Sequence, residues 1–238
     1  MDKSLKLSGI LATLLLVSTT VEATWQQNFL VGASFGNAER KGDILISRIT
    51  PPPNVQVVDA AKAYRDNGYF WGLVGGWQTY CNYWLFGAEL NADWHYYEET
   101  RNFAYTQNNT GIALSARYER NFILGLSGRA GYQIVDFLMP YIRLGIETSR
   151  DKMYTAFSIA DSFFTAEDHR RTYRFFGGVG AETPLSFLTG LSVRAELNYH
   201  AKSKAVTVMG LQADGTLALA EHAPRMFSGK LSLIYNFV

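Results

Sequence analysis

The last segment of the chain alternates strictly between apolar and polar side chains. One face is apolar and rich in aromatic residues: Phe227, Gly229, Leu231, Leu233, Tyr235 and Phe237. The other face is polar apart from Ile234: Ser228, Lys230, Ser232 and Asn236. Because side chains of a strand point alternately to its two faces, this pattern predicts a β-strand with one apolar and one polar face. A strand of a membrane barrel has this composition, with apolar residues toward lipid, polar residues toward the lumen and aromatic residues at the interface.

Residues 191–200 repeat the alternation. Leu191, Val193 and the other odd-numbered residues of this segment are apolar. Arg194 and Glu196 are among the even-numbered residues, which form the opposite, polar face. A helix would spread both sets around its circumference, so the helical interpretation fails. A strand of a soluble protein would show the same pattern, however, with its charged face in water and its apolar face in a core. The choice between the two requires information from elsewhere in the chain.

The beginning of the chain supplies that information. Lys3 and Lys6 precede a mostly apolar run over residues 7–17, and small residues surround Ala23. This arrangement predicts a secretory signal peptide over residues 1–23, because a membrane anchor needs a longer apolar run. No later segment approaches the roughly 20 apolar residues of a membrane helix. A chain of this kind can span a membrane only as a closed β-barrel, which leaves no strand edge facing lipid.

Composition supports one barrel domain over residues 24–238. Aromatic residues make up 14% of the chain, which suits interface belts, and the net charge of +1 gives no basic field for nucleic acid. The single Cys81 cannot form an internal disulfide. The four histidines, His95, His169, His200 and His222, lack the spacing of metal ligands, so we expect no metal and no cofactor.

Alternating segments and turn signals predict eight strands, at residues 26–36, 68–78, 83–97, 122–134, 138–150, 172–182, 191–201 and 227–237. Short turns would join them on one side of the membrane. Long polar loops, at residues 37–67, 151–171 and 202–225, would lie outside the cell, with both termini on the periplasmic side. Residues 111–118 also alternate, but nine strands would be an odd number. We therefore assign them to the outer extension of a bent fourth strand.

Two short segments resemble a known family. Leu126-Ser127-Gly128-Arg129-Ala130-Gly131-Tyr132, followed by Leu138-Met139-Pro140-Tyr141-Ile142-Arg143-Leu144-Gly145, resembles the Gly-Tyr, Pro-Tyr, Gly pattern of small outer-membrane β-barrel proteins of the opacity/OmpA type. The resemblance implies an all-β, eight-stranded antiparallel transmembrane up-and-down barrel in the bacterial outer membrane, with a filled lumen and a surface role. The end of the chain, Tyr235-Asn236-Phe237, resembles the signal read by the barrel assembly machinery. That signal usually ends in Phe, whereas Val238 follows here.

Charged side chains on the inward parity are the main candidate functional residues: Glu89, Arg129, Arg143, Glu147, Arg174, Arg194, Glu196 and Lys230. Ionised groups inside a narrow barrel need partners, because unpaired burial is costly. We therefore predict a network of salt bridges that plugs the lumen, in which Glu196 pairs with Lys230. The alternative is the charged constriction of a narrow channel. Eight strands enclose little more than their own side chains, which favours the plug.

A second functional class is a lipid-modifying enzyme with a Ser/His pair. His200 and Ser203 are the candidates, but they are three residues apart, and partners on one face of a strand need even spacing. A soluble periplasmic barrel that binds a lipophilic ligand is a further alternative. We therefore predict a non-enzymatic outer-membrane barrel with a structural or adhesion-type role. Its expected partners are outer-membrane lipids, the assembly machinery through Tyr235 and Phe237, and a host or surface ligand through the loops.

Overall fold

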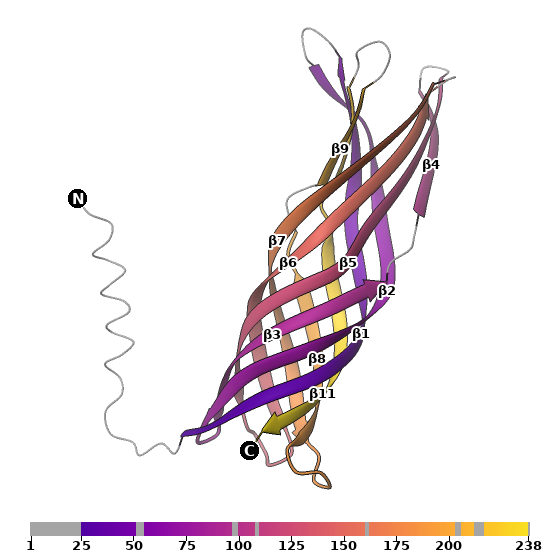
Figure 1. Cartoon of the computed structure of the whole chain (residues 1–238). Coiled ribbons are helices and arrows are strands. Elements are labelled where there is room, and N and C mark those ends of the chain that lie inside the picture. Colours follow the sequence, from indigo (N-terminus) through magenta and orange to yellow (C-terminus); the bar gives the residue numbers. More distant parts are fainter. Residues whose placement is uncertain are drawn as a thin grey trace, which may run out of the picture.

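The chain forms a tall β-barrel in the computed structural model, which describes residues 25–50, 55–96, 100–107, 110–159, 162–202, 206–211 and 217–237 (Figure 1). The predicted signal peptide, residues 1–23, lies outside the described residues. These described residues form eleven strands: β1 (Trp25–Thr50), β2 (Val55–Cys81), β3 (Trp84–Tyr96), β4 (Thr100–Gln107), β5 (Thr110–Tyr132), β6 (Met139–Ile159), β7 (Ser162–Pro184), β8 (Leu191–His200), β9 (Val206–Leu211), β10 (Leu217–His222) and β11 (Arg225–Phe237). None of the described residues forms a helix long and apolar enough to cross a membrane.

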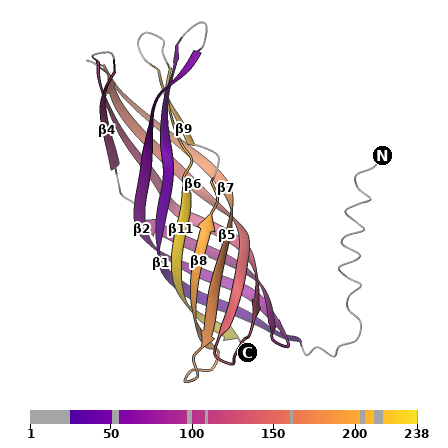
Figure 2. The ribbon, with the colours of Figure 1, turned by 180° about the vertical axis from the view of Figure 1, so that it is seen from behind.

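Eight of these strands close into a ring in the order β1-β2-β3-β5-β6-β7-β8-β11. The ring closes where β11 pairs with β1, from Phe29↔Phe237 to Lys41↔Arg225, and each neighbouring pair is antiparallel. The predicted eight-stranded antiparallel barrel is therefore confirmed. The start of β1 and the end of β11 lie at the same end of the barrel, together with the three short turns (Figure 2).

The three short turns fall where the sequence places them. They occupy residues 82–83, 133–138 and 185–190. Asn82 and Gly190 have positive φ angles, of 55° and 81°. Asparagine and glycine are the residue types that adopt this backbone conformation most readily, so the two turns reverse the chain with little strain.

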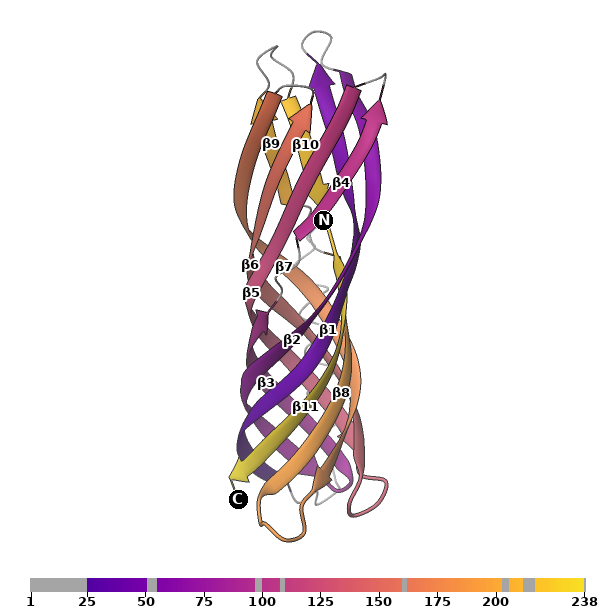
Figure 3. The same cartoon turned by 90° about the vertical axis from the view of Figure 1, so that its right-hand side faces the viewer.

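The segments predicted as long outer loops are mostly strands, and this prediction is wrong. Residues 37–50 and 55–67 belong to β1 and β2, residues 151–159 and 162–171 to β6 and β7, and residues 202–225 include β9 and β10. The strands run well beyond the length needed to cross a membrane and continue the wall upward (Figure 3). We call this upper part the outer extension: residues 40–50, 55–66, 100–107, 110–121, 150–159, 162–171, 206–211 and 217–225.

The interpretation of residues 111–118 as part of a bent fourth strand agrees with the structure, because β5 is continuous from Thr110 to Tyr132. A β-bulge interrupts its pairing with β6, since Arg120 pairs with Asp151 and Ile123 with Ser149. The two residues between them, Asn121 and Phe122, both face outward. The inward-facing residues of β5 are therefore even-numbered above the bulge and odd-numbered below it. The additional strand β4 pairs with β5 above this point.

The lower part of the barrel is apolar outside and polar inside. Its exposed outward side chains include aliphatic residues at mid-height, such as Leu90, Leu126, Ile142 and Leu231. Aromatic residues flank this band on both sides. Trp84 packs against Tyr132 near the short turns, with ring centroids 5.0 Å apart, and Trp71 stacks on Trp94 on the opposite side, at 4.3 Å. Two aromatic girdles around an aliphatic band are typical of a membrane-spanning barrel.

The outer extension has the opposite arrangement. Its interior contains a buried apolar cluster: Ile44, Ala116, Tyr118, Met153 and Ala220. Its outward side chains include ion pairs such as Arg117–Glu119, at 2.7 Å. This is the distribution of a soluble β-structure, with an apolar core and a polar surface. One continuous sheet is thus adapted to lipid in its lower part and to water in its upper part.

Candidate functional site

The lumen of the lower barrel and the base of the outer extension contain a balanced set of buried charges. Among the described residues, seven cations are buried: Arg40, Arg120, Arg129, Arg143, Arg174, Arg194 and Lys230. Seven carboxylates are buried with them: Asp66, Glu89, Asp93, Glu147, Asp151, Glu182 and Glu196. Equal numbers allow every charge to be compensated inside the barrel, which burial requires.

The part of the lumen nearest the short turns contains a closed ring of four charges. Arg129 lies 3.1 Å from Glu89 and 2.7 Å from Glu182. Arg194 contacts the same two carboxylates, at 2.9 and 3.1 Å. Each charge in the ring therefore has two partners of opposite sign. Since the four residues come from β3, β5, β7 and β8, the ring links strands on different sides of the lumen.

A second group of charges lies at mid-height. Arg143 contacts Glu196 at 3.2 Å and also donates to Ser127, while Tyr141 donates a hydrogen bond of 2.8 Å to Glu196. Lys230 lies 3.1 Å from Asp93.

The predicted pair of Glu196 and Lys230 is therefore wrong. Their backbones do face each other across β8 and β11. The Glu196 side chain nevertheless contacts Arg143, where it also accepts a hydrogen bond from the Tyr141 hydroxyl. The Lys230 side chain contacts both carboxylate oxygens of Asp93 instead.

The third group lies at the base of the outer extension. Asp151 accepts hydrogen bonds of 2.8 and 3.0 Å from Arg120 and one of 2.7 Å from Thr172, and it lies 3.3 Å from Arg174. Burial raises the pKa of Asp151, but the guanidinium groups of Arg120 and Arg174 outweigh this effect and hold it well below its usual range. Asp151 therefore stays ionised throughout the physiological pH range. Arg40 and Asp66 form a further pair beside this group.

All eight charged residues singled out in the sequence lie inside the barrel and are buried. Glu182 and Asp93 also belong to the network, although neither was predicted to be part of it. Both lie on the inward parity of their strands, so the alternation alone would have identified them. Arg40, Asp66, Arg120 and Asp151 were not included either, because they fall in segments that had been assigned to loops or to an extension without a defined inner face.

Two cavities adjoin the described lumen residues, and one of about 100 Å³ lies at the short-turn end beside Glu182, Ser192 and Asn236. A void of about 10 Å³ lies among Asp93, His95, Glu147, His200 and Lys230. A volume of this size holds about one water molecule. The site therefore has the structure of a plug, in agreement with the small interior of an eight-stranded barrel.

One hydrogen-bonded chain in the lumen has the order of a hydrolytic triad. Ser228 Oγ lies 3.1 Å from His200 Nε2, and His200 Nδ1 lies 2.8 Å from Glu147 Oε2. The sequence analysis paired His200 with Ser203 instead, and Ser203 lies outside the described residues. Ser228 is buried, and the adjoining void has no room for a substrate. A nucleophile must reach its substrate, and the burial of Ser228 opposes this.

Comparison with known proteins identifies the family of this barrel. The outer membrane protein beta-barrel domain family matches residues 9–218. The chain belongs to this family. It is therefore a protein of the bacterial outer membrane, and its apolar outer face contacts lipid. No curated protein matches the chain.

Several solved structures share the fold. The outer membrane protein OprG of Pseudomonas aeruginosa is 16% identical over 91% of this chain and 99% of its own, with a TM-score of 0.50. Neisserial surface protein A is 13% identical over 83% and 95% of the two chains, with a TM-score of 0.36. The outer membrane protease OmpT of Escherichia coli is 10% identical over 92% and 99%, with a TM-score of 0.45. At these identities the likeness is one of fold alone.

Acid is expected to destabilise the outer extension through His222. This buried side chain donates to the Asp43 carbonyl from Nδ1, at 3.2 Å, and packs edge-on against Tyr118. Burial, with Arg40 and Arg120 nearby, lowers its pKa to about 4 although the Asp43 hydrogen bond opposes the shift. Unfolded His222 would take up a proton below about pH 6.5, and the folded form only near pH 4. Stability is therefore lost as the pH falls, by about 2 kcal/mol between pH 7 and pH 5.

The measurement is the free energy of unfolding in urea at both pH values. The control is His222→Gln, which keeps a polar side chain but cannot titrate. The difference between the two proteins isolates His222 from the other histidines. An equal loss of stability in both would show that His222 does not titrate in this range.

Proposed function

We propose that this protein is a non-enzymatic surface protein of the bacterial envelope, in which the membrane barrel anchors the outer extension and the extension binds a partner. The observation that carries the proposal is the inverted packing of the extension. An apolar core around Met153, inside a polar surface, is what a folded structure outside the membrane requires. A barrel with a purely structural role would need no such structure above its membrane-spanning part.

The strand edges of the outer extension indicate how a partner would bind. Above Gly68, β2 pairs with β1, and β4 pairs with β5. Within the described strands, no ladder joins β2 to β4. The outer edge of β2 above Gly68 and the outer edge of β4 thus have no neighbouring strand among those that the structure describes. Such edges accept an extended peptide through main-chain hydrogen bonds.

The alternatives have less support. A narrow channel would require a continuous water path, whereas paired charges fill the lumen of the lower barrel. An enzyme would require an accessible nucleophile, whereas Ser228 is buried beside a void of about 10 Å³. We also infer that Tyr235 and Phe237, both exposed at the end of β11, are read by the barrel assembly machinery.

The test is a barrel without two arms of the outer extension. Lys41 pairs with Arg65, and Asp151 with Arg170, so a short turn can replace the residues between each pair without changing the register below. The variant is expected to fold, because the eight strands of the ring keep their pairing below both cuts. Heat-modifiable mobility on gels would verify folding. We expect it to lose adhesion of cells to host surfaces or to one another.

A control variant replaces residues 51–54 and 160–161 alone, which keeps the strands of both arms. If this control variant loses adhesion as fully as the armless variant does, residues 51–54 and 160–161 are the ones that bind the partner. If the folded armless variant retains every surface phenotype of the parent protein, the outer extension is not the functional part and the proposal fails.

A further inference from the structure

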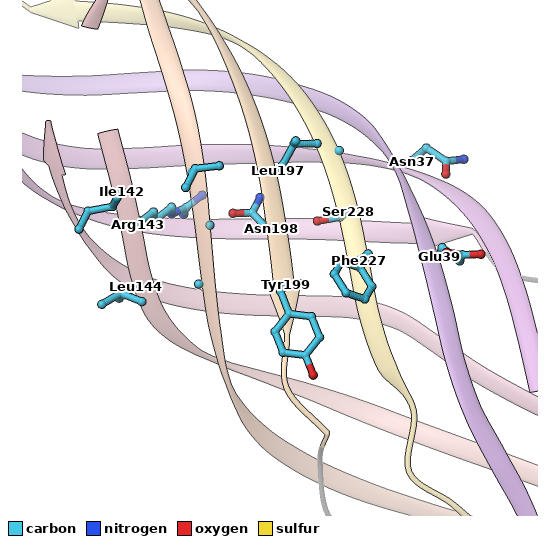
Figure 4. A pocket seen from close by; sticks show the side chains of 14 residues that line it. Asn37, Glu39, Ile142, Arg143, Leu144, Leu197, Asn198, Tyr199, Phe227 and Ser228 are labelled. Atoms are coloured by element: carbon cyan, nitrogen blue, oxygen red, sulfur yellow. The ribbon is translucent and has the colours of Figure 1, made fainter. Parts of the chain in front are cut away.

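A groove of about 740 Å³ runs across the outer face of the barrel, over β1, β11, β8, β7 and β6 (Figure 4). Two rows of outward residues that pair across these strands line it. The first row is Asn37, Gly229, Leu197, Val179 and Ile142. The second row is Glu39, Phe227, Tyr199, Gly177 and Leu144. Four residues on the inward parity of the same strands also line the groove: Arg143, Gly178, Asn198 and Ser228. The two outward rows place most of the groove in the lipid-facing wall.

The groove exists because two of its outward positions are glycines. A Cβ atom at Gly229 would come no closer than 3.7 Å to another atom, the Leu197 Cδ2, so a side chain would fit there. A Cβ at Gly177 would meet the flexible end of Leu144, at 2.9 Å. The inward Gly178 differs, since a Cβ there would collide with Asn198. The two outward glycines therefore leave open a volume that the fold does not require to be open.

A row of three cations adjoins the groove. On the outward face of β1, Lys41 follows Glu39, and its backbone pairs with Arg225 of β11 on one side and Arg65 of β2 on the other. Side chains of Lys41 and Arg65 are 37% and 67% exposed. Glu39 makes ion pairs with both, at 2.7 Å to Lys41. Three cations with one carboxylate leave a net charge of +2 beside the groove.

We propose that the groove and the three cations together bind one lipid of the outer leaflet, a phosphorylated glycolipid of the lipid A type. An apolar groove within the hydrocarbon band is filled by an acyl chain, because water there would lack partners. The long-hairpin end of the barrel faces outward, so the cations lie at the headgroup level of the outer leaflet. Basic residues at this level attract anionic headgroups. The chain and the phosphate of one lipid satisfy both features.

The experiment measures lipid retention by the purified mature protein, using native mass spectrometry in detergent. The probes are bisphosphorylated lipid A, phosphatidylethanolamine and inorganic phosphate. Wild-type protein is expected to retain lipid A in preference to phosphatidylethanolamine. Gly229→Leu, which fills the groove, should weaken retention of both lipids about tenfold, since each excluded methylene removes part of the apolar contact. Gly75→Leu is the matched control, because Gly75 is an outward glycine with open space outside the groove.

A second variant addresses the headgroup. Lys41→Gln with Arg225→Gln should weaken retention of lipid A about 20-fold, at about fivefold for each cation, and leave phosphatidylethanolamine unchanged. Arg150→Gln removes an exposed cation elsewhere and should have no effect. Gel mobility confirms folding of each variant, and Gly229→Ala serves if Gly229→Leu does not fold. Equal retention by all folded variants would overturn the proposal, as would displacement of lipid A by inorganic phosphate.

Discussion

Replacing Arg194 by Met is expected to destabilise the barrel by about 3–5 kcal/mol, the range for leaving a buried charge without its partner. Arg194 is almost completely buried and contacts both Glu89 and Glu182. Without it, the two carboxylates keep only Arg129 and, 3.8 Å from Glu89, Arg143 as cationic partners. The measurement is the free energy of unfolding in urea for the protein reconstituted in lipid vesicles.

The double variant Arg194→Met, Glu182→Gln leaves Glu89 and Arg129 as a neutral pair. Its cost should be smaller than the sum of the two single costs, because the residues share one network. Arg150→Met, at an exposed position, should change stability little. A cost below about 1 kcal/mol for Arg194→Met would show that water reaches the ring and that the lumen is not a plug.

Leu233→Arg is expected to destabilise the barrel by about 2–4 kcal/mol, the cost of a cation on the lipid face near mid-membrane. Leu233 points outward from β11, where it pairs with Ala33 and Val193 on the neighbouring strands. Its side chain therefore faces hydrocarbon, which cannot solvate a guanidinium group.

Leu45→Arg is the matched control for this substitution. Leu45 also points outward from a strand, but it belongs to the outer extension and is exposed to water. We expect its replacement to cost less than about 0.5 kcal/mol, as for an ordinary surface position. Similar unfolding costs for the two variants would contradict the assigned position of the membrane.

The sequence was sufficient to predict the membrane-spanning part of the fold. In β3 the outward positions of Trp84, Leu90 and Trp94 and the inward positions of Glu89 and Asp93 follow from alternation alone. This works because lipid selects apolar residues and the lumen selects polar ones at alternate positions. The sequence of each strand therefore shows which of its residues face lipid and which face the lumen. The number of strands followed from the requirement that a bacterial barrel closes with an even count.

The outer extension was not predictable in the same way. Residues 37–67 were interpreted as a loop because their polar residues gave no lipid-facing row. In the structure, Arg40 and Asp66 point inward and pair with each other, while Ile44 joins an apolar core. The inward face thus changes from polar to apolar within a few residues. A rule that assumes one environment along the whole strand cannot follow this change.

The alternation of residues along the strands also could not predict which charged side chains pair with each other in the lumen. Alternation places Glu196 and Lys230 inside and at one height, but several side chains converge there from across the barrel. Lys230 reaches Asp93 of β3, and Arg143 reaches Glu196 from β6. Such contacts depend on the diameter of the ring and on side-chain length. The register between neighbouring strands gives neither the ring diameter nor the reach of a side chain across the lumen.

The continuity of β1 determines how far the protein reaches from the cell. Ten residues separate the headgroup region from the end of the strand, from Lys41 to Thr50. At about 3.3 Å per residue, they span roughly 30 Å along the strand. The hairpin of β1 and β2 therefore rises well above the membrane-spanning part of the barrel. A partner too large to approach the membrane surface would still meet its tip, at a height fixed by strand length.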